Sequence, residues 1–163
     1  MPDMRIEIIT TGGTIDKVYF DAKGGYEVGP PMVEKILAEA RASVEVTITP
    51  LLRKDSLEMT DADRAAIAAA VAASTARYVI VTHGTDTMVA TAKALGSQRG
   101  KTVVLTGALQ PGRFSDSDAP FNLGMAFAAV QSLADGVYIV ANGQVFHPDR
   151  VRKNLTLNRF EAI

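Results

Sequence analysis

The stretch Tyr78-Val-Ile-Val-Thr-His-Gly-Thr-Asp-Thr-Met-Val89 decides the fold that we expect for this chain. Its apolar first half is typical of a strand buried on both faces, and a helical pattern begins at its end. The polar cluster between them, residues 83–87, therefore follows the carboxyl end of a strand. Open α/β sheets bind their ligands at that edge, so the stretch predicts a parallel sheet with a site above it.

A second segment near the N-terminus has the same organisation. Ile6-Glu-Ile-Ile-Thr10 is typical of a strand, and it runs directly into Thr11-Gly-Gly-Thr14. Glycines after a strand allow backbone N–H groups to turn towards a bound anion or oxyanion. The threonine that ends the segment could be a nucleophile, or it could cap the next element. The segment is neither a P-loop nor a dinucleotide fingerprint, because the final residues of both motifs are missing.

Strand-like runs alternate with helical patterns along the rest of the chain. This alternation predicts a three-layer, doubly wound α/β fold of the Rossmann or flavodoxin-like type, with a mostly parallel sheet. Asn142-Gly143 lies between two apolar runs and predicts a C-terminal β-hairpin, because both residues tolerate positive φ. The expected strands are Arg5–Thr10, Val44–Thr49, Tyr78–Thr82, Thr102–Thr106 and Val137–Ala141, and the expected helices are Pro31–Ala40, Thr60–Val71, Thr87–Leu95 and Phe121–Leu133.

Two stretches show neither pattern and are predicted as loops, Asp16–Gly29 and Gln110–Ala119. The first contains Gly24-Gly25 beside Tyr26 and is long enough to act as a mobile lid. No internal repeat or low-complexity linker divides the chain, so we expect one domain over residues 1–163.

Composition limits the possible classes of function. The chain has 163 residues, 47% of them hydrophobic, and a net charge of -1, so we expect neither a nucleic-acid-binding surface nor a membrane-binding basic segment. Without cysteine, thiolate chemistry is excluded, and two histidines make a metal site unexpected. His83 is expected to be a hydrogen-bonded structural residue. Neither a signal-peptide core nor a membrane-spanning apolar stretch is present in the sequence, so we expect a cytoplasmic protein. The sequence contains no metal-binding or nucleotide-binding motif, so we expect no cofactor.

The polar cluster offers a second hydroxyl, Thr85, beside the carboxylate of Asp86. A threonine hydroxyl is a poor nucleophile until a base takes its proton, and a desolvated lysine such as Lys153 can be that base. Asp86 could orient the lysine or bind a substrate ammonium. Alternatively, Asp86 caps a helix and Lys153 is a surface charge. Tyr26 also has two interpretations, a lid residue whose hydroxyl reaches Thr14 or a packing anchor.

Together, the two glycine–threonine segments resemble the signature motifs of the bacterial-type L-asparaginase/glutaminase family. The similarity rests on Ile8-Ile-Thr-Thr-Gly-Gly-Thr-Ile15 and on Val81-Thr-His-Gly-Thr-Asp-Thr-Met88. Further matches occur in the family's order and spacing, so the resemblance covers nearly the whole chain. They are Tyr26–Gly29, Asp55-Ser56, Leu105–Pro111, Ala119–Leu123 and Asp149–Lys153.

The resemblance implies an amidohydrolase that converts L-asparagine to L-aspartate and ammonia through an acyl-enzyme. Thr14 would attack the side-chain amide carbon, with Tyr26 supporting the removal of its proton. Thr85 and Lys153, with Asp86 nearby, would form a second catalytic group that activates Thr85 or the hydrolytic water. The resemblance therefore implies catalytic roles for these five residues.

The resemblance also implies a set of substrate contacts. Ser56 would hold the α-carboxylate of the substrate and Asp86 its α-ammonium, while backbone groups near Thr85 and Ala108 would line the amide site. The implied substrate-binding set is Gly13, Ser56, Leu57, Gly84, Thr85, Asp86 and Ala108.

Two departures from the family pattern shape the remaining expectations. Family members are usually much longer and carry a smaller C-terminal domain that reaches into a neighbouring subunit; we expect this chain to be the catalytic N-terminal-type domain alone. Leu57 stands where the family usually has a polar residue, so recognition of the amino acid is expected to be weaker. We expect a homodimer or homotetramer, because a neighbour can complete an open site. A glutaminase or other small-amide hydrolase with the same mechanism, and a non-catalytic amino-acid-binding module, remain as alternatives.

Overall fold

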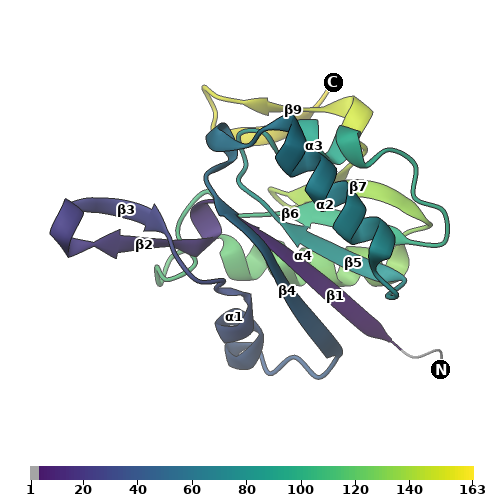
Figure 1. Cartoon of the computed structure of the whole chain (residues 1–163), viewed down its shortest axis with the longest axis horizontal. Helices are drawn as coiled ribbons and strands as arrows, with labels where there is room; N and C mark the ends of the chain where they lie inside the picture. Colours follow the sequence, from purple (N-terminus) through teal and green to yellow (C-terminus); the bar gives the residue numbers. More distant parts are fainter. Residues whose placement is uncertain (1–3) are drawn as a thin grey trace.

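The apolar runs of the sequence pair with one another in a single central sheet, which helices cover on both faces (Figure 1). The structure is a computed structural model that describes residues 4–163. The strands of the sheet are β1 (Arg5–Gly12), β4 (Glu45–Lys54), β5 (Tyr78–Thr82), β6 (Thr102–Thr106), β7 (Gly136–Ala141) and β8 (Gln144–Phe146).

The strand order is β4-β1-β5-β6-β7-β8, and all neighbours are parallel except β7 and β8. Counted along the chain, the parallel strands follow the flavodoxin-like order, in which the second strand lies outside the first. The predicted α/β class is therefore confirmed. In this order the connections after β1 and after β5 leave in opposite directions, which creates a switch point between these two strands.

The helices form the outer layers. They are α1 (Val33–Glu39), α2 (Asp61–Ala73), α3 (Met88–Leu95) and α4 (Ala119–Ser132). Alternate side chains of the central strands point to opposite faces, so Ile8 and Ile80 pack with α1 and α4, whereas Val79 and Val81 pack with α2 and α3. Burial on both faces explains why these strands are continuously apolar. Within residues 4–163, no helix combines the length and apolar character needed to cross a membrane.

Local signals placed most of these elements correctly. Strands β5 and β6 begin and end at the predicted residues, and β4 continues past Thr49 to Lys54. The predicted Asn142-Gly143 hairpin joins β7 to β8, with φ of 53° and 73° at the two residues. Helix α2 begins after Thr60, as predicted, with a capping box in which Thr60 and Asp63 exchange side-chain and backbone hydrogen bonds.

The prediction of an irregular loop over residues 16–29 is wrong. After a short 3₁₀ turn, η1 (Thr14–Asp16), the chain forms β2 (Lys17–Phe20), a second 3₁₀ turn, η2 (Asp21–Lys23), and β3 (Gly25–Val28). Strands β2 and β3 pair antiparallel, and their hairpin extends away from the sheet at the left of Figure 1. Aromatic and β-branched residues favour both strands, and Gly24 turns the chain with φ of 64°.

A second hairpin near the C-terminus was also missed. It consists of β9 (Val151–Asn154) and β10 (Arg159–Ala162), which follow a 3₁₀ turn, η4 (Pro148–Arg150). Phe160 is 1% exposed and belongs to the apolar core beneath α3. This anchor fixes β9, and β9 carries Lys153.

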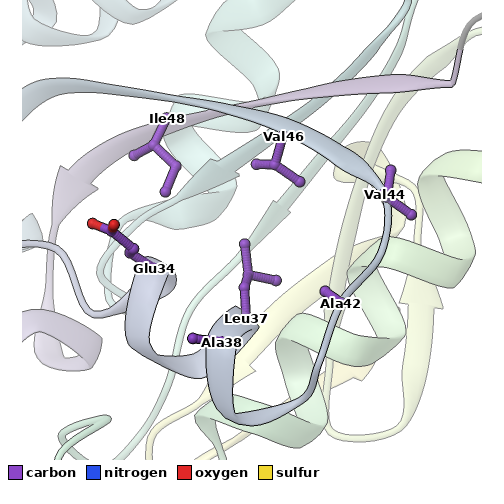
Figure 2. Close-up of a pocket in the computed structure, with 7 residues that line it drawn as sticks. All are labelled: Glu34, Leu37, Ala38, Ala42, Val44, Val46 and Ile48. Atoms are coloured by element: carbon purple, nitrogen blue, oxygen red, sulfur yellow. The ribbon is translucent and has the colours of Figure 1, made fainter.

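A hollow of about 420 Å³ lies at the edge of the sheet, between α1 and the first half of β4. Figure 2 shows Leu37 and Glu34 of α1 opposite Val46 and Ile48 of β4. The hollow is lined by residues that precede the carboxyl end of β4. It is therefore separate from the strand ends where the sequence predicts the site.

Candidate active site

The segments that follow β1 and β5 meet at two glycines. A Cβ atom added to Gly13 would lie 2.4 Å from the backbone N and 2.5 Å from the Cα of Gly84, so no side chain fits there. Gly13 has φ of 85°, and its N–H donates to the carbonyl of Lys54 over 2.9 Å. Thr14 and Thr85 directly follow these glycines. The contact therefore brings both predicted catalytic threonines to the switch point of the sheet.

Lys153 contacts two polar residues of the second motif, Thr85 and Asp86. Its Nζ donates to Thr85 Oγ1 over 2.7 Å and lies 2.6 Å from Asp86 Oδ1. The lysine side chain is only 10% exposed, whereas that of Asp86 is 36% exposed. Desolvation of an ammonium is tolerated when it is paired and hydrogen-bonded, as it is here. The geometry supports the paired interpretation, because Lys153 is not a free surface charge and Asp86 does not cap α3.

Ser56 packs against the other side of Gly84. A Cβ atom on Gly84 would lie 2.6 Å from Ser56 Oγ, and Ser56 is 1% exposed. Among residues 4–163, the Ser56 hydroxyl has no hydrogen-bond partner. Buried hydroxyls are normally paired, so a ligand that reaches this group would find it without a competing partner. The neighbouring Leu57 points outward with 73% exposure, while its N–H is held by Asp55 Oδ1 at 3.0 Å.

His83 is the buried first residue of the polar cluster, and its imidazole carries no charge. Its Nδ1 lies 2.7 Å from the carbonyl of Gly84, and its Nε2 lies 2.7 Å from Thr91 Oγ1. A carbonyl can only accept, so Nδ1 carries the proton and Nε2 accepts from the threonine. Burial lowers the pKa of His83 to about 4. The prediction of a hydrogen-bonded structural histidine is therefore confirmed.

Ala108 lies next to the cluster because Gly107 packs against the His83 carbonyl, which a Cβ atom at Gly107 would approach to 2.2 Å. Ala108 itself is 1% exposed. The segments that follow β1, β5 and β6 thus form three walls of the site.

Asp118 holds this third wall in place, and we did not predict this role from the sequence. Its carboxylate accepts the N–H groups of Leu109 and Gln110 at 2.9–3.0 Å, and Asn122 Nδ2 donates to both Asp118 and the Gly107 carbonyl. The available signal was an aspartate four residues before an asparagine, at the proline-bearing start of α4.

Tyr26 is not joined to Thr14. Its ring is 51% exposed and makes edge-to-face contacts with Tyr19, at 5.4 Å between centroids, and with Phe114, at 6.0 Å. Within the described residues, no hydrogen bond links the hydroxyl of Tyr26 to Thr14. The tyrosine here is a packing residue of the β2–β3 hairpin.

A family model described as asparaginase, N-terminal, matches residues 5–163. The chain belongs to this family. The L-asparaginase of Thermococcus kodakarensis is 30% identical over an aligned length of 172 residues, and the alignment covers 98% of this chain and 51% of that protein. The L-asparaginase 2 of Escherichia coli is 32% identical, over 93% of this chain and 47% of that protein. The resemblance that the two motifs predicted is therefore confirmed.

Solved asparaginase structures share the fold. The thermostable L-asparaginase from Thermococcus kodakarensis superimposes with a TM-score of 0.84 at 28% identity, over 98% of this chain and 51% of that one. L-asparaginase I from Vibrio cholerae gives a TM-score of 0.86 at 29% identity, over 97% and 51% of the two chains. The chain thus spans about half the length of the relatives that it matches.

Replacing Gly13 with alanine is expected to separate the two motif segments. The positive φ and the clash with Gly84 should lower the free energy of unfolding by about 3 kcal/mol or more, as measured by urea denaturation. Gly124→Ala is the matched control, because nothing lies within 4 Å of a Cβ atom there and α4 continues through it. Equal stabilities of the two variants would contradict the close contact.

His83 should make stability depend on pH. Its pKa is about 4 in the folded chain and 6.5 without burial, so the unfolded chain binds more protons between these values. This difference in pKa contributes on the order of 3 kcal/mol to the free energy of unfolding above pH 6.5. The contribution is lost as the pH falls towards 4. Denaturation of the wild type and of His83→Gln should show their stability difference shrinking over this range. Parallel pH curves would refute the buried neutral histidine.

Proposed function

We propose that the chain is the catalytic domain of an amidohydrolase that converts L-asparagine to L-aspartate and ammonia. The observation that carries the proposal is the Lys153–Thr85–Asp86 cluster, placed beside Thr14 by the contact between Gly13 and Gly84. Hydrolysis of an amide needs a nucleophile, a donor for the oxyanion and a proton for the leaving nitrogen. The three walls of the site offer all of these.

In the first half of the reaction, the Thr14 hydroxyl oxygen attacks the carbon of the side-chain amide. The C–N bond breaks, ammonia leaves with the proton that Thr14 loses, and an aspartyl ester of Thr14 remains. Backbone N–H groups near Thr85 and Ala108 stabilise the oxyanion. Tyr26 assists proton removal once its side chain leaves its packing contacts with Tyr19 and Phe114 and turns towards Thr14.

In the second half, water attacks the ester and the Thr14 oxygen leaves with a proton. Thr85 and Lys153 are suited to this step, because a hydroxyl that accepts from a paired ammonium can pass a proton to or from a neighbouring water. Asp86 keeps the lysine in position. The low exposure of Lys153 strengthens both contacts, since less water screens them.

Substrate recognition uses the polar groups around the threonines. The unpaired hydroxyl of Ser56 binds the α-carboxylate, and Asp86 binds the α-ammonium. Leu57 offers no polar contact from its side chain. A missing hydrogen bond to a charged group costs about 1.5–3 kcal/mol, so the Michaelis constant is expected to be high.

Alanine at position 14 and methionine at position 153 are expected to abolish ammonia release from asparagine. Thr14→Ala removes the attacking oxygen and Lys153→Met removes the proton donor of Thr85, so each should lower kcat by at least about a hundredfold. Ammonia release would be measured with asparagine, glutamine and simple amides, because glutaminase activity uses the same residues.

Thr156→Ala and Lys93→Met are the matched controls for these changes, and both should retain activity. Unchanged circular dichroism would show that each site variant is folded. Turnover by Thr14→Ala at the wild-type rate would refute the nucleophile. If calorimetry showed that the wild type binds asparagine but the wild type released no ammonia, the protein would be a binding module and not an enzyme.

A further inference from the structure

Asp16 ties together the two ends of the hairpin that carries Tyr26. Its carboxylate Oδ1 accepts the N–H of Met32 at 2.9 Å, and its backbone carbonyl accepts the N–H of Gly29 at 2.7 Å. Its own N–H donates to the carbonyl of Gly13 at 3.1 Å. One residue therefore connects the start of β2, the chain that leaves β3 and the turn that contains Thr14.

The segment around Gly112 joins the same point. The N–H of Gly112 donates to the carbonyl of Ile15 at 2.9 Å, and a Cβ atom on Gly112 would meet the Ile15 carbonyl and the Met32 side chain. Two residues later, the ring of Phe114 contacts Tyr26. The hairpin base and the Tyr26 side chain are thus held through one connected set of contacts around Asp16.

A further attachment of the hairpin does not involve Asp16. Lys17 Nζ lies 2.9 Å from Asp55 Oδ2, just before Ser56. Both side chains are about a quarter exposed. This ion pair involves neither the Asp16 carboxylate nor its partner Met32, so it supplies an independent way to loosen the hairpin.

The Asp16 carboxylate occupies an unusual environment for an acid. The residue is 1% exposed, and within the described chain its side chain accepts one hydrogen bond and forms no ion pair. Arg53 of β4 and Arg113 of the loop before α4 act on it only at longer range. Burial raises its pKa to about 6 in spite of these arginines. An ionised carboxylate is costly to bury with so few partners, so ionisation favours any state that exposes it.

We propose that Asp16 is the hinge of the β2–β3 hairpin, which stays closed when the carboxyl is protonated and opens more readily when it is ionised. Opening exposes the carboxyl to water and swings Tyr26 away from the turn that carries Thr14. At neutral pH the acid is ionised, and the hairpin is therefore released for substrate entry and product exit. The link to catalysis rests on the proposed function, but the opening itself does not.

Linkage fixes the direction of the pH effect. The closed hairpin binds the proton with a pKa of about 6, and the open one with the ordinary value of 3.8. The opening equilibrium constant therefore rises as the pH increases from 3.8 to about 6 and is constant above that. The pKa difference corresponds to a rise of roughly a hundredfold.

Hydrogen exchange of the Gly29 and Met32 amides, followed by NMR, tests the hinge without using activity. After correction for the intrinsic exchange rate at each pH, protection of both amides in the wild type should fall by roughly a hundredfold from pH 3.8 to 6. In Asp16→Asn, which is neutral at every pH, protection should be high and independent of pH. Amides of β5 should not change between the two proteins.

Two control variants separate the hinge from a general loosening. Asp21→Asn lies at the exposed tip of the hairpin and should keep the wild-type pH dependence. Lys17→Met removes the ion pair to Asp55 and should lower protection at every pH without changing the pH dependence. Wild-type pH dependence in Asp16→Asn, or a loss of protection that extends to β5, would overturn the hinge. Because no readout requires turnover, failure here is distinguishable from failure of the Thr14 nucleophile.

Discussion

The contact between the backbones of Gly13 and Gly84 is the constraint on which the rest of the site depends. It closes the gap between the segments that leave β1 and β5 at the switch point of the sheet. Ser56 packs on the other side of Gly84, so three segments far apart in the sequence share one small volume. A side chain on either glycine would hold these segments apart and separate the two threonines.

Burial then gives each polar group around this contact a defined state. His83 is neutral and fully hydrogen-bonded, so it orients the Gly84 carbonyl without adding charge. Lys153 is held by two contacts, a hydrogen bond to Thr85 and an ion pair with Asp86. In the proposed mechanism the two threonines therefore have different tasks. Thr85 exchanges protons with Lys153, while Thr14, on the neighbouring turn, is left to attack.

The central sheet and the motif residues could be predicted from the sequence because their signals are local. The apolar run of β5 marks a doubly buried strand, and Asn142-Gly143 marks a turn. The pairing of Lys153 with Thr85 could only be proposed, since its geometry depends on Phe160 anchoring the second C-terminal hairpin.

The β2–β3 hairpin and the role of Asp118 were missed for different physical reasons. The hairpin is a two-stranded ribbon without a clear strand or helix pattern, and its Gly24-Gly25 pair suggested a loop. Its stability comes from contacts at its base that involve distant segments. Asp118 accepts backbone N–H groups of Leu109 and Gln110. Almost every residue type has a backbone N–H group, so the residue types do not indicate this contact. In both cases a carboxylate accepts backbone N–H groups of another segment.

The identity of the acylated threonine tests the central claim most directly. Wild-type protein would be quenched in acid during turnover of asparagine, digested and analysed by mass spectrometry for an aspartyl ester. The proposed division of tasks predicts the ester on the peptide that contains Thr14 and an unmodified peptide around Thr85. An ester on Thr85 would contradict it, because the hydroxyl that is bonded to Lys153 would then be the nucleophile.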